Sequence, residues 1–247
     1  MLLQDHGTLP DMQVVITGAN RGIGLELARQ TLARGDRVYA GVRGPGSAAE
    51  LAALLGPADG RLRIALCDVA SAESVRAFAA GLTDPVDLLI NNAGVRCPPD
   101  DLAALTQEAG MEAAALTFQV NALGALRVTA ALLPHLRRAA REKFATVANI
   151  GSNLGSIADN TRGGAYGYRM AKAALNMATR SLAQDLRADG IIVVVLSPGW
   201  VQTDMGGRDA PLSVRQSVTG LLAVLDRLDL AADSGEFLDH RGERVRW

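Results

Sequence analysis

Residues 17–24 read Thr17-Gly18-Ala19-Asn20-Arg21-Gly22-Ile23-Gly24, and they join a short apolar run at 14–16 to an amphipathic segment at 22–34. Glycines let a backbone turn sharply and approach a pyrophosphate closely, and the N-terminus of the following helix offers free N–H groups. Structural turns account for many glycine-rich stretches. The position of this one, after a strand and before a helix, favours a dinucleotide-binding loop.

The same alternation of a short apolar run and a longer helical segment continues along the chain. Runs that are apolar almost throughout are typical of parallel strands covered on both faces. Gly35 and Gly190 follow two of the helical segments, where a left-handed residue commonly ends a helix. The pattern predicts an α/β fold with a doubly wound parallel sheet. We expect strands at 14–16, 38–42, 62–66, 86–90, 146–150 and 191–196, and helices at 22–34, 47–55, 71–80, 111–139 and 164–188.

Composition limits the classes of fold and partner. The 247 residues are 49% hydrophobic and 21% charged, as in globular proteins, and no break in composition divides them. We therefore expect one domain over 1–247, with residues 1–12 as an N-terminal extension. The 25 basic and 26 acidic residues nearly cancel, which argues against a nucleic-acid partner.

Signals for membranes, export and metals are missing from the sequence. The longest strongly apolar run, at 191–196, is too short to span a membrane, and the first eleven residues do not resemble a signal peptide. Cys67 and Cys97 form no disulfide framework and have no zinc-ligand spacing. We expect a soluble, cytoplasmic protein with no metal and no membrane partner.

Further motifs follow the predicted strands in a fixed order. Asp68 and Val69 come after the third strand, and Asn91-Asn92-Ala93-Gly94 comes after the fourth. Ser197-Pro198-Gly199-Trp200-Val201-Gln202-Thr203 follows the sixth strand. From about residue 13 to the C-terminus, these motifs and the glycine loop together resemble the short-chain dehydrogenase/reductase family.

The resemblance implies a Rossmann fold of about seven strands in the order 3-2-1-4-5-6-7, with the cofactor at the carboxyl ends of the strands. It implies that Asp68 contacts adenine, that Asn92 and its neighbours steady the sheet, and that Thr203 meets the nicotinamide carboxamide. The cofactor-binding residues that it implies are Gly18, Asn20, Arg21, Gly22, Ile23, Gly24, Arg43, Asp68, Val69, Asn92, Ala93, Gly94, Tyr168, Lys172, Pro198, Gly199, Val201 and Thr203.

The end of the second strand favours NADP(H) over NAD. An acid there accepts hydrogen bonds from the ribose 2′-hydroxyl in NAD-binding proteins, and an arginine suits the 2′-phosphate of NADP. In this chain the position of the acid is Val42, and Arg43 follows it. Arg21 adds a second cation within the glycine loop. The alternative is that both arginines are ordinary solvated surface charges.

Tyr168 and Lys172 are four residues apart, so they share one face of the predicted helix. A free phenol titrates near pH 10, and a nearby ammonium together with an oxidised nicotinamide lowers that pKa. Tyr168 could then exchange a proton with a substrate oxygen. A tyrosine and a lysine on an ordinary amphipathic helix would show the same spacing, and the preceding Gly/Ser loop favours the catalytic interpretation.

Two further residues complete the catalytic set that the resemblance implies. Ser152 hydrogen-bonds the reacting carbonyl, with Ser156 as the weaker candidate, and Asn121 bends its helix and completes a proton relay. The spacing from Ser152 to Tyr168 is three residues longer than in many members, so part of 157–164 must form a loop. This spacing resembles the subgroup of C-factor-like and sniffer-like carbonyl reductases.

The sequence therefore predicts an oxidoreductase that moves a hydride between NADP(H) and a carbonyl or alcohol, and the family resemblance implies that the 4-pro-S hydrogen is the one transferred. The alternative is an NADP-binding regulatory or signalling protein with little turnover. A nucleotide-sugar epimerase is disfavoured because Arg21 stands where that branch needs glycine. The resemblance also implies a homodimer or homotetramer that pairs through the two longest predicted helices.

Overall fold

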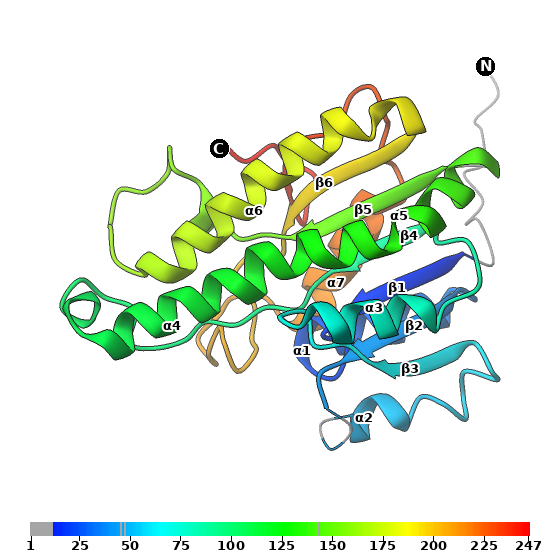
Figure 1. Ribbon diagram of the computed structural model, residues 1–247, viewed down its shortest axis with the longest axis horizontal. Helices are drawn as coiled ribbons and strands as arrows, with labels where there is room; N and C mark the ends of the chain where they lie inside the picture. The colour runs from blue at the N-terminus through cyan, green and yellow to red at the C-terminus, as the bar shows by residue number, and fades with distance from the viewer. Residues whose placement is uncertain (1–11, 45, 47, 143) are drawn as a thin grey trace.

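The sheet contains seven parallel strands within the described residues of this computed structural model, which are 12–44, 46, 48–142 and 144–247. Their order is β3-β2-β1-β4-β5-β6-β7, which confirms the expected topology (Figure 1). Residues 1–11 of the expected N-terminal extension lie outside the described residues. The strands are β1 Gln13–Thr17, β2 Arg37–Val42, β3 Leu62–Leu66, β4 Leu88–Asn91, β5 Ala145–Ile150, β6 Ile191–Ser197 and β7 Phe237–Asp239.

Helices cover both faces of the sheet (Figure 1). Helices α3, α5 and α6 pack on one face, and α1, α2 and α7 pack on the other. The helices are α1 Gly22–Ala33, α2 Ala49–Ala52, α3 Ala72–Ala80, α4 Glu108–Phe118, α5 Ala125–Glu142, α6 Tyr166–Asp185 and α7 Val214–Leu225.

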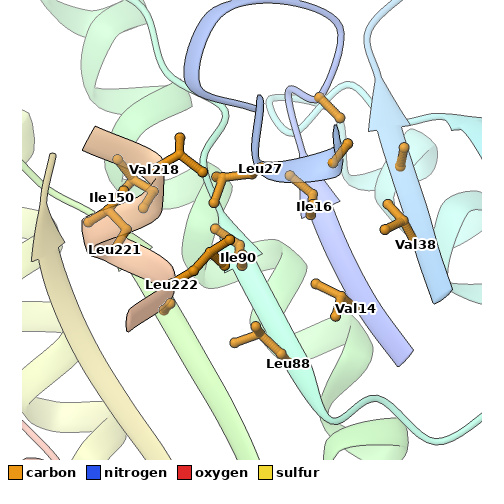
Figure 2. Packing of buried hydrophobic residues seen from close by; sticks show 14 of the residues in the cluster. Val14, Ile16, Leu27, Val38, Leu88, Ile90, Ile150, Val218, Leu221 and Leu222 are labelled. Carbon is orange, nitrogen blue, oxygen red and sulfur yellow. The ribbon is translucent and has the colours of Figure 1, made fainter. Parts of the chain in front are cut away.

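Successive residues of a strand point to opposite faces of the sheet, so they pack into two separate parts of the hydrophobic core. Val14 and Ile16 of β1 face α1 and α7, whereas Val15 between them faces α3 and α5. Figure 2 shows α7 laying Val218 and Leu222 over the middle of the sheet. Because both faces are buried, the central strands have no polar face, as their near-continuous apolar sequences predict.

The predicted helix at 111–139 is part of a longer helix that changes its winding. Helix α4 continues into a π-helical segment, Gln119–Gly124, and then into α5. The whole stretch Glu108–Glu142 is long and apolar enough to cross a membrane by length and composition, but α5 packs against the sheet as a core helix does.

Two predicted helices are shorter than expected. Residue 47 of the helix expected at 47–55 lies outside the described residues. The rest of that helix shrinks to α2, because the N–H groups of Leu54 and Leu55 bond three residues back and tighten the chain into turns. The helix at 164–188 begins only at Tyr166, because the three residues at 163–165 all have positive φ. It ends at Asp185, and a 3-10 turn leads to Gly190, whose left-handed φ of 73° matches the expectation.

Ile90 tests the contribution of the packed core to stability. Its side chain is fully buried in the middle of the sheet, so Ile90→Ala should lower the free energy of unfolding by about 2–5 kcal/mol. Leu66→Ala removes a similar side chain that is 55% exposed and should cost less than about 1 kcal/mol. Urea denaturation of both variants measures the difference. Equal losses would contradict the burial pattern.

Candidate active site

The predicted site residues come from different strands but converge at one edge of the sheet. The glycine loop follows β1, Asn92 follows β4, Ser152 follows β5 and Thr203 follows β6. Carboxyl ends of parallel strands share an edge, and ligands of doubly wound sheets bind there. The neighbouring helices α4 to α6 then bring the remaining side chains to this edge.

Tyr168 and Lys172 lie one turn apart on the buried face of α6. They are 9% and 5% exposed, and Lys172 Nζ lies 5.7 Å from the centre of the Tyr168 ring. The spacing of four residues therefore places both side chains on one face of α6, as the sequence predicts. Lys172 Nζ donates a hydrogen bond to the Ile150 carbonyl at 2.7 Å, which ties α6 to the end of β5. Burial lowers the pKa of Lys172 to about 8.

Ser152 lies beside Tyr168 despite the long segment between them. Residues 157–164 are exposed, which is the loop that the spacing requires. Gly155 keeps the serine segment close to α6, because a Cβ on this glycine would come within 2.9 Å of Lys172 Cβ. Ser156, the weaker candidate, instead donates its hydroxyl to the Trp247 carbonyl at 3.3 Å.

The pKa of Tyr168 is raised above its ordinary value. Burial of the phenol is the largest cause, and a hydrogen bond with Ser152 and the charge of Arg96 oppose it. The direction differs from the lowered pKa that the Tyr–Lys spacing predicts, because the loss of hydration outweighs these two favourable contacts. Lys172 directs its ammonium to a backbone carbonyl instead.

Asn121 lies at the centre of the π-helical segment between α4 and α5. Its side chain makes two hydrogen bonds with the backbone of Val95: Nδ2 donates to the carbonyl and Oδ1 accepts from the N–H, both at 2.8 Å. Short π segments inside α-helices often mark functional sites. The bend expected at Asn121 is therefore present as a change from α-helical to π-helical winding. The two hydrogen bonds of Asn121 fix the position of the segment that leaves β4.

The glycine loop has the close backbone contacts that a phosphate site needs. A Cβ on Gly18 would lie 2.9 Å from Ala93 Cα, and a Cβ on Gly24 would lie 2.2 Å from the Gly18 carbonyl oxygen. Gly18 and Gly22 also have positive φ. Arg21 precedes α1 with extended backbone and no side-chain cap, so the first N–H groups of this helix have no side-chain acceptor at that position.

The residues after β3 and β4 frame this loop. Asn92 Nδ2 donates to the carbonyls of Thr17 and Gly18, both at 3.0 Å, and the Ala93 N–H donates to Thr17 Oγ1. Asp68 Oδ1 accepts a hydrogen bond from the Ala70 N–H in a tight turn. Val69 is buried next to the π-helical segment, where a Cβ on Gly124 would touch it.

The two arginines proposed to select the cofactor differ in their contacts. Arg43 is exposed at the end of β2, next to the buried Val42. Arg21 forms an ion pair with Asp204 at 2.6 Å, which joins the glycine loop to the segment after β6. Both groups are exposed, so this pair contributes little to stability and can rearrange around an anionic ligand.

The segment after β6 forms the other wall of the site. The Pro198 carbonyl accepts the Ser217 hydroxyl at 2.7 Å, and Gly199 has a φ of 79°. Val201 bridges to Leu212. Thr203 lies against the glycine loop, because its Cγ2 is 3.5 Å from the position of a Cβ on Gly22.

These features fit a dinucleotide and do not fit a metal. The glycines leave a cradle that side chains would fill, and the uncapped N-terminus of α1 suits a pyrophosphate. Within the described residues, no three His, Cys, Asp or Glu side chains lie close enough together to hold a metal ion.

Sequence reasoning gave no role to two residues at this site, Arg96 and Asp100. The guanidinium carbon of Arg96 lies 6.0 Å from the centre of the Tyr168 ring. Asp100 accepts the N–H groups of Gly167 and Tyr168 at 2.6 and 3.3 Å, so it caps α6 from another segment. Neither contact has a signal in the sequence, because the partners are some 70 residues apart.

Comparison with known proteins matches this architecture. The family model of the short chain dehydrogenases covers residues 12–211. The chain belongs to the short-chain dehydrogenase family. C-signal of Myxococcus xanthus, one relative, is 52% identical to this short-chain dehydrogenase over 174 residues, which are 70% of this chain and all of C-signal.

Solved structures of carbonyl reductases have the same fold as this short-chain dehydrogenase. The NADPH-bound carbonyl reductase from chicken fatty liver is 36% identical, with a TM-score of 0.89 over 97% of this chain and 100% of its own. The carbonyl reductase Sniffer of D. melanogaster is 32% identical, with a TM-score of 0.88 over 96% of this chain and 100% of its own.

Burial of Lys172 predicts a pH-dependent stability. Its pKa is about 8 in the folded protein and 10.5 without burial, so the unfolded chain binds more protons between these pH values. The free energy of unfolding should therefore rise with pH in this window, by up to about 1.4 kcal/mol per pH unit, relative to Lys172→Met. Urea denaturation of both proteins across the window measures this. A constant difference would mean that Lys172 keeps its ordinary pKa.

Proposed function

We propose that this protein reduces carbonyl compounds with NADPH. One observation carries the proposal: the buried Tyr168 lies beside Ser152 and Lys172, at the edge of the sheet where the glycine loop forms its cradle. The similar structures from chicken fatty liver and D. melanogaster are carbonyl reductases, the first of them NADPH-bound, and they support the same reaction. Bound NADPH would supply the hydride.

The protein's own residues would hold the carbonyl and move the proton. Tyr168 donates its phenolic proton to the carbonyl oxygen, and the raised pKa keeps that proton in place at neutral pH. Ser152 donates a hydrogen bond to the same oxygen. Lys172 would hold the ribose of the nicotinamide, and its charge, 5.7 Å from the centre of the Tyr168 ring, would favour the phenolate that the proton transfer leaves. Asn121 positions the chain after β4 through Val95 and completes the route for the returning proton.

NADP(H) is the cofactor that the charges favour. No carboxylate stands at the end of β2, where Val42 is buried and Arg43 is exposed. Asp68, which follows β3, would bind the adenine, and Thr203, which lies against the glycine loop, would bind the nicotinamide. A Burkholderia multivorans short-chain dehydrogenase/reductase structure with bound NADP, 35% identical, supports this choice.

A regulatory role is the second candidate, because the relative at 52% identity is named C-signal. A signalling protein that only binds NADP would not need a proton donor, a carbonyl hydrogen-bond donor and a buried lysine in contact. The joint presence of Ser152, Tyr168 and Lys172 therefore favours turnover.

We also propose a cytoplasmic homodimer or homotetramer with no nucleic-acid or membrane partner. Cys67 and Cys97 are free, as reducing surroundings require. Helices α4 and α6 expose large apolar side chains that a second copy would cover. These are Met111, Leu116, Phe118, Met170 and Met177.

Removal of one hydroxyl tests the proton donor. Tyr168→Phe should lower turnover of an accepted aldehyde by about 10²–10⁴-fold, because the ring stays and only the acid is lost. NADPH affinity should hardly change. Tyr166→Phe, two residues away on the same helix, is the control and should keep nearly full activity. NADPH oxidation followed by absorbance gives both rates, and loss of activity in the control alone would contradict the assignment.

A reversal of charge at the end of β2 tests the preference for NADPH over NADH. The wild type should bind NADPH about 10–150-fold more tightly than NADH, the range of a charge-assisted hydrogen bond. Val42→Asp combined with Arg43→Ala should erode or reverse this preference. Fluorescence titration with both dinucleotides gives the affinities. Equal affinities in the wild type would refute the proposed selection of NADP(H).

Light scattering tests the oligomer. At micromolar concentrations the wild type should have two or four times the mass of one chain, because association covers the apolar side chains of α4 and α6. Met177→Lys, which puts a charge on a 68% exposed methionine, should weaken association without unfolding the protein. A monomeric wild type would exclude the proposed pairing.

A further inference from the structure

Arg96 lies at the mouth of the site, on the segment that leaves β4. The side chain is exposed, and its guanidinium carbon is 6.0 Å from the centre of the Tyr168 ring. Lys172 Nζ is 5.7 Å from the same ring centre. The ring of the proposed acid therefore has two cations beside it, one buried and one open to solvent. The proposed mechanism uses only the buried one.

Three carboxylates line the same pocket as Arg96, a space of about 440 Å³, but none forms an ion pair with it in the described part of the chain. Each carboxylate has another partner. Asp100 accepts two backbone N–H groups at the start of α6, and Asp101 accepts one in its own turn at 2.8 Å. Asp204 pairs with Arg21 at 2.6 Å. The guanidinium of Arg96 therefore keeps its donors available to a ligand.

The backbone on both sides of Arg96 is held in place. Asn121 bonds both polar backbone atoms of Val95, the residue before it, at 2.8 Å. Asp100, four residues after it, is bonded to the first turn of the helix that carries Tyr168. These contacts fix the backbone of the segment relative to Tyr168, so the flexible Arg96 side chain extends from a fixed point beside the pocket.

We propose that Arg96 binds an anionic group of the substrate, so that the site prefers carbonyl compounds that carry a carboxylate. The proposal rests on the proposed reductase function. The planar guanidinium matches a carboxylate with two parallel hydrogen bonds. The pocket has the size of a small-molecule site. Arg96 lines it and lies 6.0 Å from the centre of the Tyr168 ring, so a one-ring substrate with its carbonyl at Tyr168 would bring its far end within reach of Arg96. Among the described residues that line the pocket, Arg96 is the one cation, so an anionic group that enters it would bind there.

A pair of aldehydes that differ only in charge tests this proposal. We expect kcat/KM with NADPH to be about tenfold higher for para-carboxybenzaldehyde than for methyl para-formylbenzoate, as for one charge-assisted hydrogen bond. Arg96→Met should remove the preference through the KM of the acid, and Arg96→Lys should keep part of it. Arg76→Met removes an equal charge from an exposed position on α3 and should leave the preference unchanged. Equal values in the wild type, or a preference that survives Arg96→Met, would overturn the proposal.

A binding measurement separates this proposal from the reductase function. Para-(hydroxymethyl)benzoate and its methyl ester can be titrated into the protein saturated with NADPH, where no reaction follows because both partners are reduced. Tighter binding of the acid that depends on Arg96 would support the anion site even if neither aldehyde were reduced. Equal affinities of the acid and the ester would reject the anion site, even in an active reductase.

Discussion

Buried side-chain hydrogen bonds join the centre of the sheet to α5 and to α6, the helix that carries Tyr168 and Lys172. Asn91 Nδ2 on β4 donates to Thr129 of α5 at 3.0 Å and to Asn149 of β5 at 2.9 Å, and Asn149 donates to Thr179 of α6 at 2.9 Å. All four side chains are at most 5% exposed. A shift of either helix along the sheet would leave buried amides unpaired, at a cost of about 1–3 kcal/mol for each group. The position of Tyr168 relative to the strand ends depends on this constraint.

Burial shifts the pKa values of Tyr168 and Lys172 in opposite directions, and both shifts suit the reduction of a carbonyl. Burial raises the pKa of Tyr168, so the phenol keeps a proton to give at neutral pH. Burial lowers the pKa of Lys172 to about 8, yet the ammonium has a carbonyl acceptor in Ile150 and stays mostly charged at neutral pH. Arg96 opposes the effect of burial on Tyr168 from the open side of the pocket. The site thus combines a protonated acid with cations that stabilise the phenolate left after proton transfer.

The local sequence pattern predicted six of the strands and the motifs at the strand ends, whereas the family resemblance supplied the seventh strand and the strand order. The start of α6 was placed two residues early, because residues 163–165 have positive φ and because Asp100 caps the helix from 67 residues away, a contact that no local pattern reports. The ion pair of Arg21 with Asp204 spans 183 residues and escaped the sequence for the same reason. The direction of the Tyr168 pKa was wrong, because burial depends on the packing of elements that the spacing of two residues does not describe.

The central claim is that this fold brings a carbonyl carbon, a proton donor and a hydride donor together in one orientation. NADPH that carries deuterium at the pro-S position of the nicotinamide tests it directly, with mass spectrometry of the alcohol formed from an accepted aldehyde. The account predicts that the deuterium appears on the carbinol carbon, and that NADPH labelled at the pro-R position gives an unlabelled alcohol. Transfer of the pro-R label, or no labelled alcohol from any aldehyde, would contradict it.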